Sequence, residues 1–385
     1  YIMTSTNNTV DYNNGLTHGR VLNFGAGPGC LPEEVLLEAQ QELLNFQGSG
    51  KSIMELSHRG KEYSKVHEDA KSNLRLLLNI PENYDILFLQ GGATSLFAGI
   101  PINLCNGNND TIDYLVTGAW SKSAYNEAKM YTKVNAVADM ESTKFRTVAE
   151  PSDWKRSDNA SYFYYCDNET VHGVEMPSQQ VYDNVPASIP ILCDMSSNFL
   201  SRPVDVSKFG LIYAGAQKNA GIAGITIVII RKDLLQKSKP DTPNVFNFLK
   251  KSQQNSLDNT PPTFNIYIMG LVLKWLLKNG GLDEMSRLSQ TKSHMLYDFV
   301  DNSNGFYTCY IDKKYRSRMN ACIRIKDGDE AMEEKFFKAA EKHGITDVKG
   351  HRSVGGVRVS LYNAITVRGV EVLLAFMKEF MAQNQ

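Results

Sequence analysis

A lysine and an aspartate stand directly after two apolar runs that read as neighbouring buried strands. Lys218 follows the run 211–213 in a Gly-Ala-Gln-Lys-Asn turn, and Asp194 ends the run 191–193. A lysine amine can form a Schiff base with an aldehyde cofactor, and a carboxylate can pair with a protonated pyridine nitrogen. Taken singly, Lys218 is more often a surface lysine, and Asp194 fits a helix N-cap equally well. Only the two together, one βαβ step apart, favour a cofactor site.

Two further strand ends carry groups that suit a ring and a phosphate. Gly91-Gly92-Ala93-Thr94-Ser95 follows the run 86–89 and opens a helix, where free backbone N–H groups hold phosphate. Trp120 follows the run 114–116 on a turn of small residues. A tryptophan there either stacks on a pyridine ring or packs in the core, and the second alternative is at least as common. Each signal is weak alone.

Two similar cationic dipeptides lie far apart in the sequence. His58-Arg59 and His351-Arg352 both sit between small or hydroxyl residues, and Arg358 follows the second pair closely. Arginine guanidinium groups suit carboxylates and phosphates because they donate two parallel hydrogen bonds. Any one of these arginines is more often part of a surface ion pair. Together they indicate a site for an anionic substrate.

The glycine-rich segment 25–29 invites comparison with a dinucleotide-binding loop, but the third glycine of that motif falls on Cys30. Pro28 also removes a donor amide from the segment. We therefore reject a dinucleotide-binding loop.

The elements that must position these residues alternate between strands and helices from about residue 33 to 230. Apolar runs at 86–89, 114–116, 162–166, 191–193, 211–213 and 225–230 are each followed by small or polar residues. This alternation predicts an α/β fold with a mostly parallel sheet that is covered on both faces. In such sheets the ligand lies beyond the carboxyl ends of the strands, which is where Lys218, Asp194 and Trp120 stand.

A smaller α+β domain is predicted after the sheet. The polar turn 259–263 precedes an apolar helix over 266–278, Gly280-Gly281 stops that helix, and a long linking helix begins near Leu282. Strands at 321–325 and 357–361 and helices at 330–343 and 367–381 complete this part. The predicted division is a disordered tail at 1–19, a segment at 20–32 that packs with the small domain, a large domain at 33–281 and a small domain at 282–385.

The composition excludes several classes of protein. Lys and Arg number 41 against 42 Asp and Glu, so no overall field recruits nucleic acid or an anionic membrane. The six cysteines show no C-x-x-C spacing and no secretory signal precedes them, which predicts reduced thiols in a cytoplasmic protein. No apolar run approaches the roughly 18 residues of a membrane span. We expect no metal site.

The sequence resembles the phosphoserine aminotransferases, which are class-V, pyridoxal-phosphate-dependent aminotransferases. The resemblance covers almost everything after the tail, and nine segments occur in the same order. They are 23–28, 57–59, 91–94, 117–121, 168–173, 194–198, 215–219, 259–263 and 350–353. The family implies fold type I, the aspartate aminotransferase-like fold of pyridoxal-phosphate enzymes. Gly29 and Cys30 depart from the residues usual in the family.

The resemblance assigns roles around the cofactor. Lys218 would hold pyridoxal 5'-phosphate covalently and move the proton, and Asp194 would pair with the ring nitrogen. Trp120 would stack on the ring, and Thr170 would contact the ring hydroxyl. The residues implied for the cofactor phosphate are Ala93, Thr94 and Gln217, with Asn259 and Thr260 reaching across from a second subunit. The family therefore implies a homodimer.

The resemblance also implies the substrates. Arg358 would bind the substrate α-carboxylate, whereas a second set would accept the substrate phosphate or the side-chain carboxylate of glutamate. That second set is His58, Arg59, His351 and Arg352. The implied reaction converts L-glutamate and 3-phosphohydroxypyruvate into 2-oxoglutarate and O-phospho-L-serine, in serine biosynthesis.

Three alternatives differ in class. A cysteine desulfurase needs a mobile catalytic cysteine, and none of the six lies in a glycine- or serine-rich loop near the end of the chain. An alanine-type aminotransferase does not need the paired His-Arg motifs. A non-enzymatic scaffold would lose Lys218 or Asp194 first, and both are present.

Overall fold

The structure is a computed structural model that describes residues 12–385. The predicted disordered tail spans 1–19, and its first eleven residues lie outside the described part. Among residues 12–19, Tyr12 and Asn13 contact the C-terminal helices. The ring of Tyr12 lies 4.6 Å from that of His343, and Arg368 Nε donates a hydrogen bond to the carbonyl of Asn13 at 2.9 Å.

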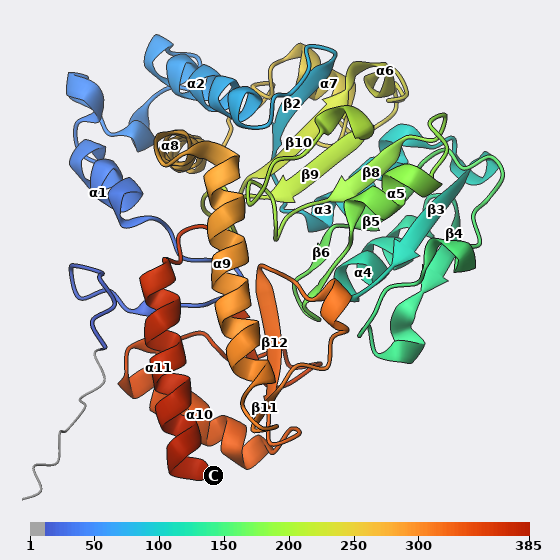
Figure 1. Ribbon diagram of the computed structural model, residues 1–385. Helices are drawn as coiled ribbons and strands as arrows, with labels where there is room; N and C mark the ends of the chain where they lie inside the picture. The colour runs from blue at the N-terminus through green and yellow to red at the C-terminus, as the bar shows by residue number, and fades with distance from the viewer. Residues whose placement is uncertain (1–11) are drawn as a thin grey trace, which may run out of the picture.

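A seven-stranded sheet forms the centre of the larger part of the molecule (Figure 1), in the order β2-β10-β9-β8-β5-β3-β4. All neighbouring pairs are parallel except those of β10, which runs antiparallel to both β2 and β9. The prediction of a mostly parallel α/β sheet is confirmed. The strands are β2 (Tyr84–Leu89), β3 (Thr111–Val116), β4 (Lys133–Asp139), β5 (Phe163–Cys166), β8 (Ile191–Asp194), β9 (Leu211–Gly215) and β10 (Thr226–Arg231).

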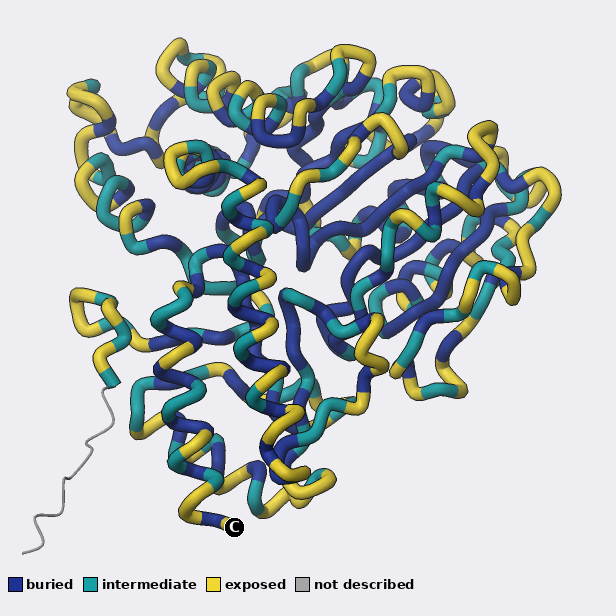
Figure 2. Tube along the Cα trace, viewed as in Figure 1, coloured by how far each residue is buried: buried dark blue, intermediate teal, exposed yellow. Residues whose placement is uncertain are grey.

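The sheet is buried on both faces because its strands carry apolar residues at nearly every position. Side chains alternate between two clusters: Ile212 and Ile229 join the cluster on one face, whereas Leu211 and Val228 join the cluster on the other. Apart from edge strand β4, the strands are mostly dark in Figure 2, and exposure concentrates on the outer helices and loops. Edge strand β4 was not predicted, because its sequence KVNAVAD has half-buried positions and no continuous apolar run.

Helices cover both faces of this sheet (Figure 1). One layer contains α1, α2 and α8, in which α8 contacts both other helices, and the other contains α3, α4 and α7. Helix α2 packs through one face, because its buried residues recur at helical spacing. They include Tyr63, His67, Ala70 and Leu74. The bounds are α1 (Glu33–Glu42), α2 (Lys61–Leu77), α3 (Thr94–Leu104), α4 (Ala119–Ala128), α5 (Ser178–Asn184), α6 (Lys232–Leu235), α7 (Phe248–Gln253) and α8 (Thr263–Lys278).

The C-terminal part has its own apolar cluster and an antiparallel sheet in the order β11-β12-β14. The predicted helices and both predicted strands are present here. The N-terminal segment joins this part, because β1 (Leu22–Asn23) pairs in parallel with β13 (Ile345–Thr346). The other bounds are α9 (Gly281–Asp301), β11 (Tyr307–Thr308), β12 (Asn320–Ile325), α10 (Glu330–Lys342), β14 (Val357–Ser360) and α11 (Val367–Asn384).

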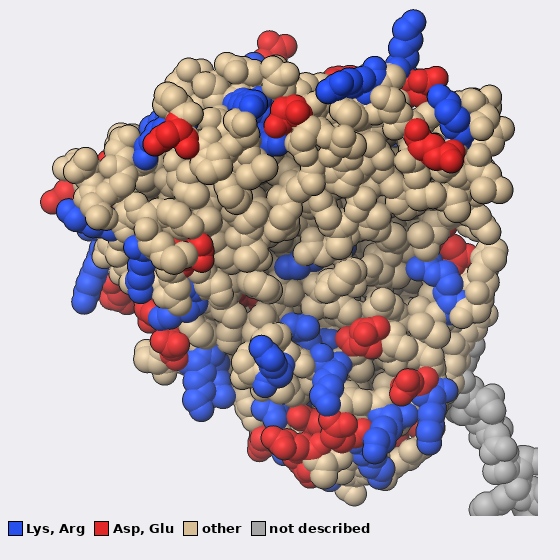
Figure 3. Space-filling model, turned by 180° about the vertical axis from the view of Figure 1, so that it is seen from behind, with Lys and Arg blue, Asp and Glu red and all other residues tan. Residues whose placement is uncertain are grey.

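Charge is spread over the surface rather than gathered by sign. On the face shown in Figure 3, basic and acidic side chains alternate around the rim and over the lower half, and basic groups also lie in and below the central hollow. Within residues 12–385, no helix combines the length and apolarity that crossing a membrane requires.

Candidate active site

The strand register brings the predicted site loops to one edge of the sheet. Leu89 at the end of β2 and Gly215 at the end of β9 both lie opposite Thr226 of β10. Asp194 at the end of β8 pairs with Cys166 on one side and with Tyr213 on the other. The loops that follow these strands therefore start side by side, as expected for a ligand site in a parallel sheet.

Lys218 lies at the centre of this edge. Its Nζ donates a hydrogen bond to Thr170 Oγ1 at 2.8 Å and lies 5.8 Å from the ring centroid of Trp120. Burial lowers the pKa of Lys218 from its ordinary value, and the negative charge of Asp194 opposes this shift. A lowered pKa raises the fraction of neutral amine, which is the nucleophilic form. The amine can therefore attack an aldehyde held beside Trp120.

The glycine-rich N-terminal segment packs against the lysine. Gly29 N–H donates to the carbonyl of Gln217 at 2.7 Å, and Tyr362 Oη donates to the carbonyl of Ala26 at 2.7 Å. Gly27 adopts φ +134°, and a Cβ there would lie 3.3 Å from Cγ of Lys218. The segment therefore serves close backbone approach to Lys218 and not dinucleotide binding.

Asp194 is fixed by its neighbour Ser196. The side chain of Asp194 is 4% exposed, and its Oδ1 accepts hydrogen bonds from the backbone N–H and the hydroxyl of Ser196 at 2.9 and 2.6 Å. The same hydroxyl accepts from Gly215 N–H at 3.0 Å. Within the described residues Oδ2 makes no hydrogen bond. One oxygen is thus anchored, and the other remains for a cation such as a protonated ring nitrogen.

Glu169 positions Trp120, and the sequence analysis missed this role. Glu169 Oε2 accepts from the Trp120 N–H at 2.9 Å, and Oε1 accepts from the N–H and the hydroxyl of Ser121 at 2.9 and 2.5 Å. The carboxylate therefore caps the N-terminus of α4, and burial raises its pKa. Trp120 Nε1 is buried without a hydrogen-bond partner. The available signal was an acidic residue three positions after the end of β5, within the polar segment that follows that strand.

The loop before α3 presents free backbone donors. Gly91 and Gly92 adopt φ +99° and +70°, which turns the chain sharply into the helix. Within the described residues, the N–H groups of Ala93 and Thr94 make no backbone hydrogen bond, as is usual in a first helical turn. This loop can hold a phosphate through those amides.

Arg358 reaches the same centre from the C-terminal sheet. Its Nη1 donates to the carbonyl of Thr170 at 3.4 Å, so Lys218 and Arg358 both contact Thr170. Burial lowers the pKa of His351, and the nearby positive charges of Arg358 and Arg352 lower it further. The structure thus brings Arg358, and His351 with it, close to the residue that Lys218 contacts.

Five predicted site residues are not joined to this centre within one chain. Arg352 is exposed and lines a separate cavity of about 370 Å³ beside α10. Within residues 12–385, no hydrogen bond, ion pair or ring contact links His58 or Arg59 to Lys218. Asn259 and Thr260 are exposed, and Gln90 Nε2 donates to the carbonyl of Thr260 at 3.4 Å. The single chain brings together Lys218, Asp194, Thr170, Trp120, Gln217 and Arg358.

The residues at the sheet edge fit pyridoxal phosphate. A buried amine, an aspartate with one free oxygen, an aromatic ring and free amides at a helix N-terminus supply what its aldehyde, ring nitrogen, ring face and phosphate need. The unpartnered Trp120 Nε1 is a buried polar atom that only a further group would satisfy.

The comparisons with known proteins agree with this fold and site. The family described as Aminotransferase class-V matches residues 21–373, and the chain belongs to that family. A probable phosphoserine aminotransferase of Dictyostelium discoideum is 65% identical over 367 residues, which cover 95% of this chain and 98% of that protein. The predicted family resemblance is confirmed.

Solved structures show the same likeness. Phosphoserine aminotransferase from Bacillus circulans subsp. alkalophilus superposes with a TM-score of 0.90 at 41% identity, covering 95% of this chain and 99% of that one. A phosphoserine aminotransferase from Trichomonas vaginalis, solved with pyridoxal phosphate bound, gives a TM-score of 0.86 at 41% identity, covering 93% and 100%.

Proposed function

We propose that this protein is a pyridoxal-phosphate-dependent transaminase that converts L-glutamate and 3-phosphohydroxypyruvate into 2-oxoglutarate and O-phospho-L-serine. The observation that carries the proposal is the convergence of Lys218 and Arg358 on Thr170, beside Asp194 and Trp120. An amine for a cofactor and a guanidinium for a substrate carboxylate meet there. The likeness to phosphoserine aminotransferases supports the choice of substrates.

Lys218 both binds the cofactor and moves the proton in this proposal. Pyridoxal phosphate, when bound, withdraws electrons from the α-carbon of an attached amino acid. Lys218, with its lowered pKa, then accepts the α-proton and donates it back at a later step of the same half-reaction. Asp194 keeps the ring nitrogen protonated, and Ser196 holds Asp194 in place. Trp120 would stack on the cofactor ring.

Arg358 binds the α-carboxylate that both substrates share. Arg358 and Lys218 both donate hydrogen bonds to Thr170, so the guanidinium lies close to the lysine amine. The second anionic group of each substrate, a phosphate or a side-chain carboxylate, goes to His58, Arg59, His351 and Arg352. His351 stays neutral more readily than a free histidine because its pKa is lowered, so it can accept or donate a hydrogen bond there.

A homodimer completes the site in this proposal. The segment that precedes His58 and Arg59 carries two large apolar side chains, Leu44 and Met54, which are 86% and 55% exposed. Exposed large apolar side chains in this part of the chain support a protein–protein interface there. We infer that the partner subunit supplies these two cations, together with Asn259 and Thr260 for the cofactor phosphate.

Two further predictions stay proposals. The six cysteines are free, which supports a reducing compartment such as the cytoplasm. The two apolar clusters on the large sheet and the separate C-terminal cluster support domain boundaries near residues 33 and 282.

The test is the reaction itself, followed in both half-reactions. The protein loaded with pyridoxal phosphate should lose its visible cofactor absorbance on addition of L-glutamate, and 3-phosphohydroxypyruvate should restore it with stoichiometric release of O-phospho-L-serine. Pyruvate and oxaloacetate serve as control acceptors. Restoration by pyruvate as efficiently as by the phosphorylated acid would contradict the proposed substrate.

A further inference from the structure

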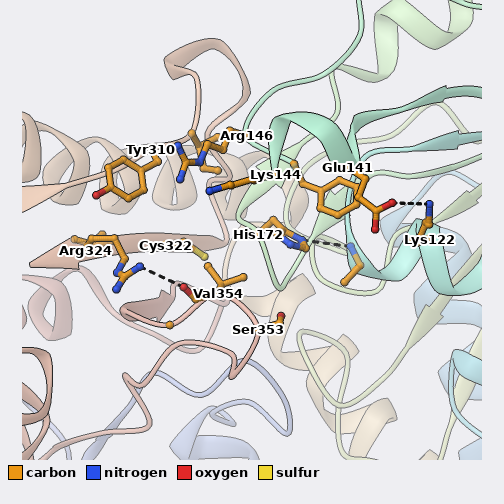
Figure 4. A pocket seen from close by; sticks show the side chains of 15 residues that line it. Lys122, Glu141, Lys144, Arg146, His172, Tyr310, Cys322, Arg324, Ser353 and Val354 are labelled. Carbon is orange, nitrogen blue, oxygen red and sulfur yellow. Dashed lines mark hydrogen bonds and ion pairs between the residues drawn. The ribbon is translucent and has the colours of Figure 1, made fainter. Parts of the chain in front are cut away.

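A cavity of about 730 Å³ lies next to the proposed reaction centre and has no role in the function described so far. It opens between the large sheet and the C-terminal sheet (Figure 4). Ala119, which precedes Trp120, lines it, and so does Cys322, which pairs across β12 and β14 with Arg358. The volume suffices for a small ligand. The cavity therefore borders the proposed reaction centre, and we call it the antechamber.

Cations dominate the lining of this antechamber. Four Lys or Arg residues line it, whereas Glu141 is its one carboxylate among the described residues. Lys122 is already paired with Asp139 and Glu141, at 2.5 and 3.2 Å. Arg324 is paired with Glu333 at 2.7 Å. Lys144 and Arg146 make no ion pair in the described part of the chain, so the antechamber carries an uncompensated positive charge.

The Arg146 guanidinium lies over the Tyr310 ring and donates no hydrogen bond within the described residues. Its guanidinium carbon lies 4.5 Å from the ring centroid of Tyr310, a stacked position that leaves the N–H edges free. The carbonyl of Arg146 accepts from Asp312 N–H at 2.9 Å, which ties this loop to the segment that carries Tyr310. Lys144 lies beside it in Figure 4, on the same wall of the cavity.

The backbone holds Lys144 at this wall in an uncommon conformation. Lys144 and Phe145 adopt φ +56° and +55° in succession, a left-handed region that residues with a Cβ seldom enter. The Phe145 ring is buried and lies 4.7 Å from the ring of His172. Backbone strain of this kind persists where the surroundings enforce it and clusters at ligand sites.

We propose that Lys144 and Arg146 form an outer anion site that captures the phosphate monoester dianion of the substrate before it reaches Lys218. The inference rests on the proposed function for the identity of the ligand. A dianion gains most from a wall with two unpaired cations, and attraction over a cleft raises the rate of association. Glutamate, which lacks the phosphate, gains less.

The test compares association rates of two substrates in the loaded protein. In stopped-flow absorbance at low ionic strength, the double variant Lys144→Gln/Arg146→Gln should react with O-phospho-L-serine about 10-fold more slowly per unit concentration than wild type. The rate with L-glutamate should fall about 2-fold, and both deficits should shrink at about 0.5 M salt. The matched control is Lys133→Gln/Arg156→Gln, which removes two exposed cations outside the cavity.

A binding measurement separates the site from the reaction. The line width of inorganic phosphate in phosphorus NMR should report weaker binding to Lys144→Gln/Arg146→Gln than to the control variant, with unchanged circular dichroism. If the double variant matches the control in both phosphate binding and association rate, the outer site does not exist. Loss of phosphate binding with an unchanged rate for O-phospho-L-serine would overturn substrate capture. A wild-type protein that does not react with O-phospho-L-serine would instead refute the proposed function.

Discussion

The two ends of the proposed site are built by different means. The end around Lys218 is formed by one chain: Asp194, Thr170 and Trp120 stand at the ends of buried strands and are fixed by partners such as Ser196 and Glu169. The anion-binding end is dispersed, because Arg59 and Arg352 are exposed and lack contact with that centre. The groups around Lys218 are held by the sheet, whereas in the proposed function the exposed cations are completed by a second subunit.

The largest effect should follow from removing the amine of the first end. Lys218→Ala is expected to lower transamination by roughly 10²–10⁴-fold or more, because proton transfer and cofactor attachment both lose their group. Borohydride reduction and peptide mapping should find no cofactor on the remaining lysines. Lys208→Ala, which changes an exposed lysine, is the control. Reduction that still traps cofactor in the Lys218→Ala protein would assign attachment to another lysine.

The second largest effect should follow from removing the charge of Asp194. Asp194→Asn retains the shape and the hydrogen bonds to Ser196 but removes the charge that keeps the ring nitrogen protonated. The single-turnover rate should fall by roughly 10²-fold, with a much smaller change in substrate affinity. A rate within a few-fold of wild type would show that the charge is not needed.

The dispersed end should distinguish the substrates. Arg352→Ala should remove a charge-assisted contact worth about 1.5–3 kcal/mol and weaken reaction with O-phospho-L-serine more than with glutamate. Arg358→Ala should impair both alike, because both present an α-carboxylate. The ratio of the two kcat/KM values is the measurement, since it cancels general damage. A ratio that shifts in Arg358→Ala and not in Arg352→Ala would reverse the two assignments.

The smallest effect is expected on stability, through buried His67. His67 lies in α2, the helix that follows His58-Arg59, and burial lowers its pKa to about 4. The unfolded chain binds this proton near pH 6.5, so stability is full above that pH and falls as the pH drops towards 4. Urea unfolding should lose about 2 kcal/mol between pH 7.5 and 5 from this group.

His67→Phe should reduce the loss of unfolding free energy between pH 7.5 and 5. His294→Phe, which changes an exposed residue of α9, should leave that loss unchanged. If His67→Phe lost as much unfolding free energy at low pH as wild type, other groups would set the stability at acid pH.

The sequence predicted the first end far better than the second. Lys218, Asp194 and Trp120 follow apolar runs that had to be buried strands, so their common edge follows from parallel topology. Strand β4 escaped prediction because its half-buried position leaves no apolar run. The place of Arg352 could not be predicted, because nothing local decides on which side of its loop an exposed side chain lies.

Residues that hold others in place were also missed. Ser196 and Glu169 bond to backbone groups that become neighbours only in the folded chain. Lys144 and Arg146 lie between two sheets whose relative position no local pattern encodes.

The central claim is that one chain builds the reaction centre and its partner supplies Arg59, and mixed dimers test it most directly. Lys218→Ala and Arg59→Ala chains are each expected to be impaired, yet after subunit exchange in equal amounts about a quarter of wild-type activity should return. Half of the dimers are then mixed, and one of the two sites in each is intact. Mixing Lys218→Ala with Asp194→Asn, whose lesions lie in the same chain's centre, should restore nothing. Failure of the Lys218→Ala and Arg59→Ala mixture to regain activity, with mixed dimers shown to be present, would contradict the account.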